Sequence, residues 1–232
     1  MIKGILFDFN GVIIDDEPVH LKAYQQVLKR SDIELSEADY YESLGMDDVR
    51  FVEAAFKRVG KDLSEATLQN VLDEKLTAYR SLISDHLPLF DGAVNLAKQL
   101  QHHYILGIVS MARREDIEAI LHRADIYNCF SAIVSAEEVT NCKPNPEGYN
   151  LGFRKLDEIN TRKGGYALDR ANVVAIEDAP PGIIAAKTAG LKVLGVANTV
   201  SVQALRDSGA DSVTKTLADM THETFDLVFG EA

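Results

Sequence analysis

The chain has 232 residues, of which 46% are hydrophobic, so it can bury the core of one large domain or of two modest ones. Its formal net charge is -12, and no local cluster of Lys or Arg offsets it, which argues against nucleic acid or an anionic membrane as a partner. No apolar run approaches the ~20 residues that span a bilayer, and the N-terminal residues carry no leader pattern. We therefore expect a cytoplasmic protein that acts on a small molecule, as a monomer or, alternatively, a dimer.

A short apolar run near the N-terminus ends on a carboxylate. Ile5, Leu6 and Phe7 precede Asp8, and Asn10-Gly11 follows as a pair that accepts a tight turn. In open α/β sheets, ligands bind beyond the carboxyl ends of buried strands. The pattern therefore predicts that Asp8 lies at the mouth of a binding site, whereas the alternative is a strand followed by an ordinary acidic loop.

The segment 16–87 carries no convincing strand. Its apolar residues recur at helical spacing, and Gly45 and Gly60 interrupt the pattern. Ser64 is a suitable N-cap for the last predicted helix of the segment. We interpret residues 16–87 as an all-helical cap domain inserted after the first strand, with hinges at its two connections.

From residue 88 onward, helical and apolar strand patterns alternate. This alternation predicts an α/β fold with a Rossmann-like parallel sheet and helices on both faces, formed by residues 1–15 and 88–232. The polar stretch 157–170 is predicted to be a loop. Helices are predicted at 92–102, 113–123, 146–156 and 181–189, and strands at 104–109, 131–134, 172–176 and 191–196.

Chemically active side chains follow several of these strands. Strand ends converge at one edge of a parallel sheet, and a hydroxyl, an ammonium and carboxylates there suit phosphoryl transfer to a carboxylate nucleophile. Carboxylates alone would repel a phosphate by roughly 4 kcal/mol per charge pair about 4 Å apart, so a lysine and a divalent cation such as Mg²⁺ are needed. The residues concerned are Asp8, Ser110, Lys143, Glu177 and Asp178.

Each of these residues also has an ordinary structural interpretation. Ser110 could cap the following helix, and Lys143 could be an exposed lysine. Glu177 and Asp178 could belong to a polar loop in front of a helix that begins with proline. Their joint order along the chain favours a common site.

Four motifs carry a resemblance to a known family: LFDFNGVI with the following DDEPVH, then VSMARR, CKPNPEGY and IEDAPPGIIAAKTAG. In these motifs the chain resembles the haloacid dehalogenase superfamily, in particular the beta-phosphoglucomutase-like phosphatase branch with a helical cap. The resemblance implies that Asp8 is the nucleophile, forming an aspartyl-phosphate, and that Ser110 and Lys143 hold the transferring phosphoryl group. It implies Mg²⁺ binding by Asp8, Asp178, the Asn10 backbone carbonyl and the neighbouring Glu177. It also implies substrate contacts at His20, Gly45, Arg50 and Met111.

Asn10 departs from the family pattern, which has a second aspartate at this place acting as general acid and base. An amide cannot transfer a proton at neutral pH, and the loss would raise the barrier by roughly 3–5 kcal/mol for a poor leaving group. The activity would then be weak, or confined to good leaving groups, or assisted by another acid such as Asp15, Asp16 or Glu17. A further alternative is that Asn10 was introduced to trap a complex.

These observations predict an Mg²⁺-dependent phosphatase that acts on small phosphorylated metabolites, in particular sugar phosphates, through a phospho-Asp8 intermediate. The alternative is a catalytically impaired family member that binds a phosphorylated ligand or a protein partner. Mutase and phosphonate-cleaving chemistry are further alternatives.

Overall fold

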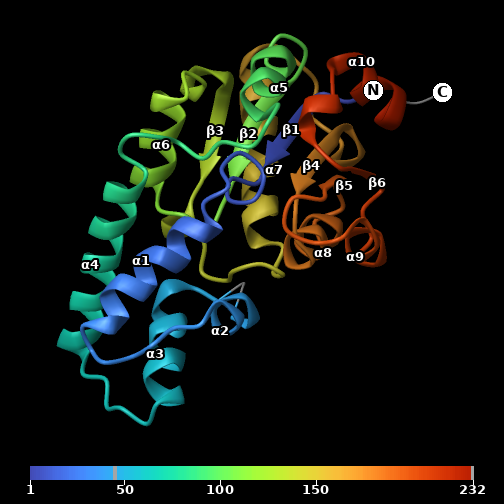
Figure 1. Cartoon of the computed structure of the whole chain (residues 1–232). Coiled ribbons are helices and arrows are strands. Elements are labelled where there is room, and N and C mark those ends of the chain that lie inside the picture. The colour runs from blue at the N-terminus through green and yellow to red at the C-terminus, as the bar shows by residue number, and fades with distance from the viewer. Residues whose placement is uncertain (44–45, 231–232) are drawn as a thin grey trace. The chain divides into compact units, whose positions relative to one another are not determined.

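The computed structural model describes residues 1–43 and 46–230. By their internal contacts the residues divide into two compact units, one formed by Met1–Asp15 with Leu89–Ala232 and the other by Asp16–Pro88. We call them the α/β unit and the helical unit (Figure 1). Among the described residues, no helix combines the length and the apolar character needed to cross a membrane.

The α/β unit is built on a six-stranded sheet of order β3-β2-β1-β4-β5-β6, in which all neighbours are parallel. The register places Phe7 opposite both Ile108 and Ile176, so the carboxyl ends of the three central strands are level. This confirms the predicted fold class. The strands are β1 (Gly4–Phe7), β2 (Ile105–Val109), β3 (Phe130–Val134), β4 (Val173–Glu177), β5 (Lys192–Val196) and β6 (Ser212–Thr214).

Both faces of this sheet are covered. Leu6 belongs to one core cluster with Tyr149 and Leu156 of helix α7, while the adjacent Ile5 and Phe7, which point to the opposite face, are also fully buried. Continuous apolar strands are therefore explained by burial on two sides. The helices of this unit are α5 (Ala93–Leu100), α6 (Arg114–Arg123), α7 (Glu147–Arg162), α8 (Pro180–Thr188), α9 (Val202–Asp207) and α10 (His222–Phe229).

The prediction of a loop over 157–170 was wrong for its first part. Helix α7 continues to Arg162, because Leu156 and Ile159 keep the helical spacing and pack against the core while polar residues occupy the exposed face. Gly164, with φ of +86°, follows the end of the helix in the left-handed conformation that glycine favours.

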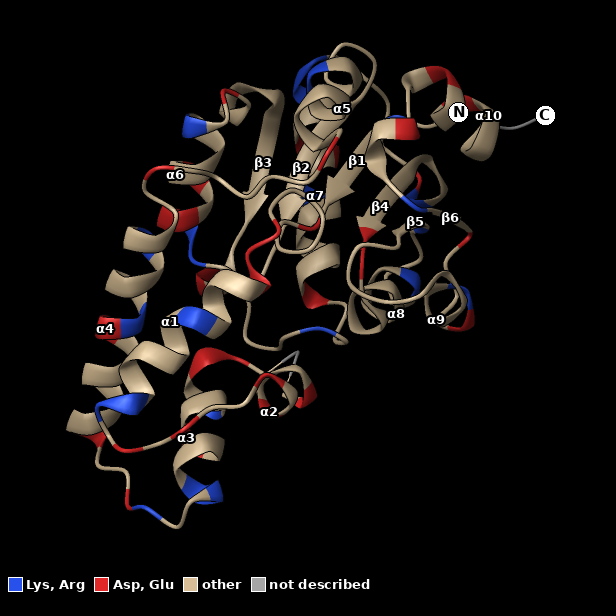
Figure 2. Ribbon diagram, in the orientation of Figure 1, with Lys and Arg blue, Asp and Glu red and all other residues tan. Residues whose placement is uncertain are grey.

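The described part of the helical unit contains α1 (Glu17–Lys29), α2 (Glu37–Glu42), α3 (Asp48–Arg58) and α4 (Glu65–Leu82). Ser64 caps α4 as predicted, accepting a hydrogen bond from the Thr67 amide at 3.1 Å. The short helix α2 was not predicted. Figure 2 shows acidic and basic residues on the same helices, as along α4.

A buried lysine links three helices of this unit. The Lys75 side chain is 6% exposed, and its ammonium lies 2.9 Å from Asp48 Oδ2, while Asp48 Oδ1 accepts a hydrogen bond from the Tyr24 hydroxyl. The Asp48 side chain is 58% exposed, so water can solvate it if its partner is lost. The ammonium has no such access to water.

This difference in exposure predicts that replacing Asp48 and replacing Lys75 affect the stability of the protein unequally. Asp48→Ala leaves a buried ammonium without its carboxylate and should lower the free energy of unfolding by about 3 kcal/mol. Lys75→Met keeps the packing and leaves a solvated acid, so it should change stability little. Urea unfolding followed by circular dichroism measures both, and equal losses would contradict this account.

Candidate active site

The loop after β1 presents Asp8 at the carboxyl edge of the sheet. The Asp8 amide donates to the Ile176 carbonyl at 2.9 Å, which continues the pairing with β4 for one more residue. The Phe9 amide donates to Asp8 Oδ1 at 2.8 Å. The chain then turns at Gly11, where φ is +77°. The backbone therefore fixes both the place and the rotation of the Asp8 carboxylate.

Lys143 joins this carboxylate to the end of β4. Its Nζ atom lies 2.9 Å from Asp8 Oδ1 and 2.7 Å from Glu177 Oε1. Burial disfavours the charged amine, but the nearby Asp8 and Glu177 carboxylates outweigh that effect and raise the pKa of Lys143. Lys143 is thus a fixed positive charge between two acids rather than an exposed surface lysine.

Three carboxylates lie close together at this edge of the sheet. Their combined negative charge exceeds the single positive charge of Lys143. Oxygens of Asp8, Glu177 and Asp178 lie within 4.8 Å of one another. Burial, together with the charge of Asp8, raises the pKa values of Glu177 and Asp178. Within the described chain, Glu177 Oε2 is buried without a hydrogen-bond partner. This set of hard oxygen donors fits a divalent cation such as Mg²⁺.

Ser110 follows β2 and is fully buried. Its Oγ donates to Asn10 Oδ1 at 3.3 Å and accepts from the Ala112 amide at 3.0 Å. The residue at the N-cap of α6 is Arg113, so the alternative that Ser110 merely caps this helix is wrong. The hydroxyl and the Asn10 amide instead contact each other beside Asp8.

The fold brings together Asp8, Asn10, Ser110, Lys143, Glu177 and Asp178, all of which belong to the α/β unit. Met111 belongs to the same unit and is partly buried next to Ser110. Gly45 lies outside the described residues.

His20 and Arg50 belong to the helical unit. His20 stacks on the Tyr79 ring with centroids 4.4 Å apart, and its Nε2 lies 3.3 Å from Asp16 Oδ2. The Arg50 side chain is 73% exposed and lies 3.4 Å from an Asp47 oxygen. Their proposed substrate contacts remain predictions.

Two of the acids considered as substitutes for Asn10 are engaged within the helical unit. Asp16 is fully buried and accepts a hydrogen bond from the Tyr79 hydroxyl at 2.6 Å. Glu17 accepts from the Tyr40 hydroxyl at 2.5 Å, and burial raises the pKa of Glu17. Each carboxylate thus has a structural partner in its own unit.

Sequence reasoning missed three residues that contact the site. Tyr149 of α7 is fully buried and donates its hydroxyl to Glu177 Oε1, while the Lys143 ammonium lies 5.4 Å from the Tyr149 ring centroid. Asn198 and Thr199, after β5, contact Gly11 and Asp178. The position of Tyr149 within the CKPNPEGY motif was a usable signal, whereas the loop after β5 offered none.

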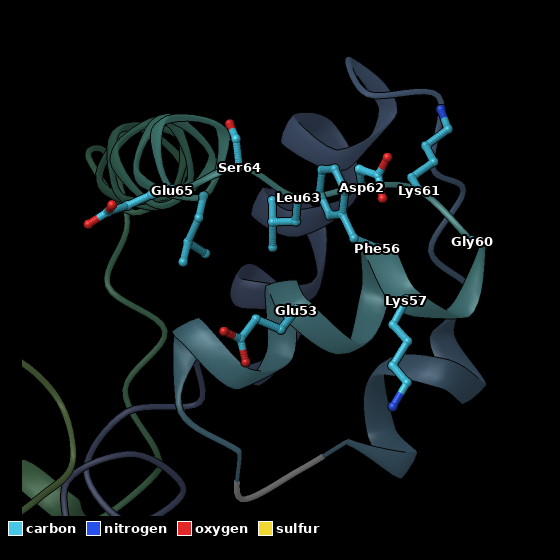
Figure 3. A pocket seen from close by; sticks show the side chains of 10 residues that line it. Glu53, Phe56, Lys57, Gly60, Lys61, Asp62, Leu63, Ser64 and Glu65 are labelled. Carbon is cyan, nitrogen blue, oxygen red and sulfur yellow. The ribbon is translucent and has the colours of Figure 1, made fainter.

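A pocket of about 660 Å³ lies elsewhere, between the end of α3 and the start of α4 in the helical unit (Figure 3). It contains none of the predicted site residues. Its lining includes both lysines and carboxylates, so it presents no single charge to a ligand. Its lining residues are Glu53, Phe56, Lys57, Gly60, Lys61, Asp62, Leu63, Ser64, Glu65 and Leu68.

Comparison with known proteins identifies the family of this chain. The model of the haloacid dehalogenase-like hydrolase family matches residues 5–196. The chain is 30% identical to beta-phosphoglucomutase of Bacillus subtilis, over 96% of this chain and 93% of the relative. It is 27% identical to the phosphorylated carbohydrates phosphatase of Thermotoga maritima, over 92% and 94% of the two chains.

A crystal structure of beta-phosphoglucomutase from Clostridium difficile has the same fold, with a TM-score of 0.83, 22% identity and coverage of 99% of this chain and 97% of the other. The family model and the phosphatase relative identify an enzyme of the hydrolase class. The chain belongs to the haloacid dehalogenase-like hydrolases, in the beta-phosphoglucomutase-like branch, as its motifs predicted.

The buried acids make stability depend on pH in a defined direction. Their raised pKa values mean that the folded state binds more protons than the unfolded state, so stability is lost as the pH rises from the ordinary pKa range of these carboxyl groups through their raised pKa values. Without divalent ions, the melting temperature should fall from about pH 5.5 to about pH 8.5. Mg²⁺ should raise it more at the higher pH, because the ligands are then ionised.

Differential scanning calorimetry at the two pH values checks this prediction, with Asp178→Asn as the control. The variant should have a shallower dependence on pH and a smaller response to Mg²⁺. A melting temperature that rises with pH in the metal-free protein would contradict the assignment.

Proposed function

We propose that this protein is an Mg²⁺-dependent phosphatase that acts on small phosphorylated metabolites, in particular sugar phosphates. The observation that carries the proposal is the contact of the Lys143 ammonium with Asp8, beside two further buried carboxylates. The name of the Thermotoga maritima relative, a phosphorylated carbohydrates phosphatase, supports the substrate class.

Asp8 is the proposed nucleophile. Its carboxylate attacks phosphorus, the bond from phosphorus to the substrate oxygen breaks, and an aspartyl-phosphate forms on Asp8. Water then attacks that phosphorus, the bond from phosphorus to the Asp8 oxygen breaks, and inorganic phosphate leaves with the Asp8 carboxylate regenerated. Lys143 and the Phe9 amide both contact Asp8 Oδ1, so the carboxylate meets the substrate in a fixed orientation.

The electrostatics of the cluster require cations. Asp8, Asp178 and Glu177 are the side chains that would hold or support Mg²⁺, together with the Asn10 backbone carbonyl. When bound, Mg²⁺ supplies positive charge that lets a phosphate dianion approach the carboxylates. Lys143 and the Ser110 hydroxyl would hold the transferring phosphoryl group, with Lys143 adding a permanent charge.

Asn10 limits which substrates react. Its amide oxygen accepts a hydrogen bond from Ser110 and cannot supply a proton to a departing alkoxide. In the α/β unit, the nearby Glu177 and Asp178 already interact with Lys143, Tyr149 or Thr199. We therefore expect efficient attack on acyl and aryl phosphates, whose leaving groups need no proton, and slow attack on sugar phosphates.

The same residue favours one alternative function. If the missing acid and base reduce turnover to nothing, the site would serve to bind a phosphorylated ligand, or a protein partner, rather than to hydrolyse it. Mutase chemistry is less favoured because it needs the acid and the base twice. Phosphonate cleavage is less favoured because no motif specifically supports it.

Asn10→Asp separates these possibilities. The substitution should raise kcat/KM for a hexose phosphate by about 10²–10⁴-fold, because it supplies the acid for an alkoxide leaving group. For acetyl phosphate the gain should be much smaller, since acetate leaves without a proton. The parameter kcat/KM is chosen because it reports steps only as far as departure of the leaving group.

Asp8→Asn is the control and should be inactive on both substrates. Equal gains on the two substrates would contradict the leaving-group explanation. A parent chain that hydrolyses neither substrate, beside an active Asn10→Asp variant, would refute the phosphatase proposal for this sequence and favour the binding alternative.

A further inference from the structure

The loop after β5 reaches two separate parts of the site. The Asn198 side-chain amide donates to the Gly11 carbonyl at 2.8 Å, and the Thr199 hydroxyl donates to Asp178 Oδ2. Consecutive residues of one loop thus contact both the turn after β1 and the carboxylate after β4. None of the four sequence motifs includes this loop.

The backbone of the loop is fixed on both sides of these contacts. The Ala197 amide donates to the Thr214 carbonyl at 3.0 Å, which ties the start of the loop to β6. Ser201 caps α9 by accepting from the Ala204 amide at 3.2 Å. The Thr199 hydroxyl is therefore held by the framework of the sheet and not by a freely moving segment.

Asp178 is confined from a second direction. It is 5% exposed, and a Cβ atom added to Gly11 would lie 2.0 Å from Asp178 Oδ2. Gly11 also has a positive φ, so glycine is required there by both the turn and the carboxylate. Asp178 Oδ2 is therefore in contact with both the Gly11 backbone and the Thr199 hydroxyl.

We propose that Thr199 is a positioning residue for the Mg²⁺ site. By donating to Oδ2, its hydroxyl holds Asp178 in the rotamer that faces Asp8 and Glu177, while Asn198 keeps the Gly11 turn against the same carboxylate. The inference rests on the proposed function, because it assumes that these acids bind Mg²⁺.

Calorimetric titration with Mg²⁺ alone tests this role without relying on turnover. Thr199→Val should weaken Mg²⁺ binding by about 10–100-fold, the usual effect of removing a hydrogen bond to a metal ligand. Thr199→Ser keeps the hydroxyl and should bind Mg²⁺ nearly as the parent does. Thr199→Ala provides the same loss of the hydroxyl if the valine variant does not fold.

Thr214→Val is a matched control. The Thr214 hydroxyl donates to the Thr216 carbonyl at 2.9 Å, so this variant also loses a threonine hydrogen bond but none to a metal ligand. Its Mg²⁺ affinity should equal that of the parent. With acetyl phosphate as substrate, saturating Mg²⁺ should restore most of kcat in Thr199→Val, because the nucleophile itself is unchanged.

The outcomes separate this inference from the proposed function. If the parent binds Mg²⁺ and Thr199→Val binds it equally well, the positioning role is refuted while the phosphatase proposal stands. The role is also refuted if Thr199→Ser loses as much affinity as the valine variant. If the parent binds no Mg²⁺ at all, both the role of Thr199 and the proposed metal dependence fail.

Discussion

The ammonium of Lys143 holds together acids that would otherwise repel one another. It lies 2.9 Å from Asp8 and 2.7 Å from Glu177, and Asp178 completes the group of carboxylates. At an effective dielectric near 20, two unit charges about 4 Å apart attract or repel each other by roughly 4 kcal/mol. A single lysine therefore contributes strongly to the electrostatic energy of this cluster. It still leaves net negative charge, and that excess is the physical reason to expect a divalent cation.

The sheet makes this cluster possible through its register. Because the ends of β1 and β4 are level, Asp8 and Glu177 come from neighbouring strands at the same height. Lys143 lies on the segment that follows β3. Backbone pairing therefore places the two acids side by side, and the loop after β3 supplies the opposite charge.

Much of this could be predicted from the sequence because it depends on local patterns. Apolar runs that end on Asp8, Ser110 and Glu177 indicate buried parallel strands with polar termini, and their convergence follows from topology alone. The contacts of Asn198 and Thr199 could not be predicted, because they depend on how the loop after β5 packs against strands that are distant in sequence. The contact of Tyr149 was missed although this residue ends the CKPNPEGY motif. The extension of α7 past Leu156 was missed because a polar exposed face resembles a loop when its buried side is not known.

The central claim is that Asp8 is the nucleophile, and Asn10 makes the claim unusually accessible to experiment. An enzyme that lacks its base should release phosphate slowly, so acetyl phosphate with Mg²⁺ should leave one phosphoryl group on the protein. Intact-mass and peptide mass spectrometry after acid quenching should find that group on Asp8 and find none on the Asp8→Asn variant. A phosphoryl group on another residue, or hydrolysis by the Asp8→Asn variant at the parent rate, would contradict the account.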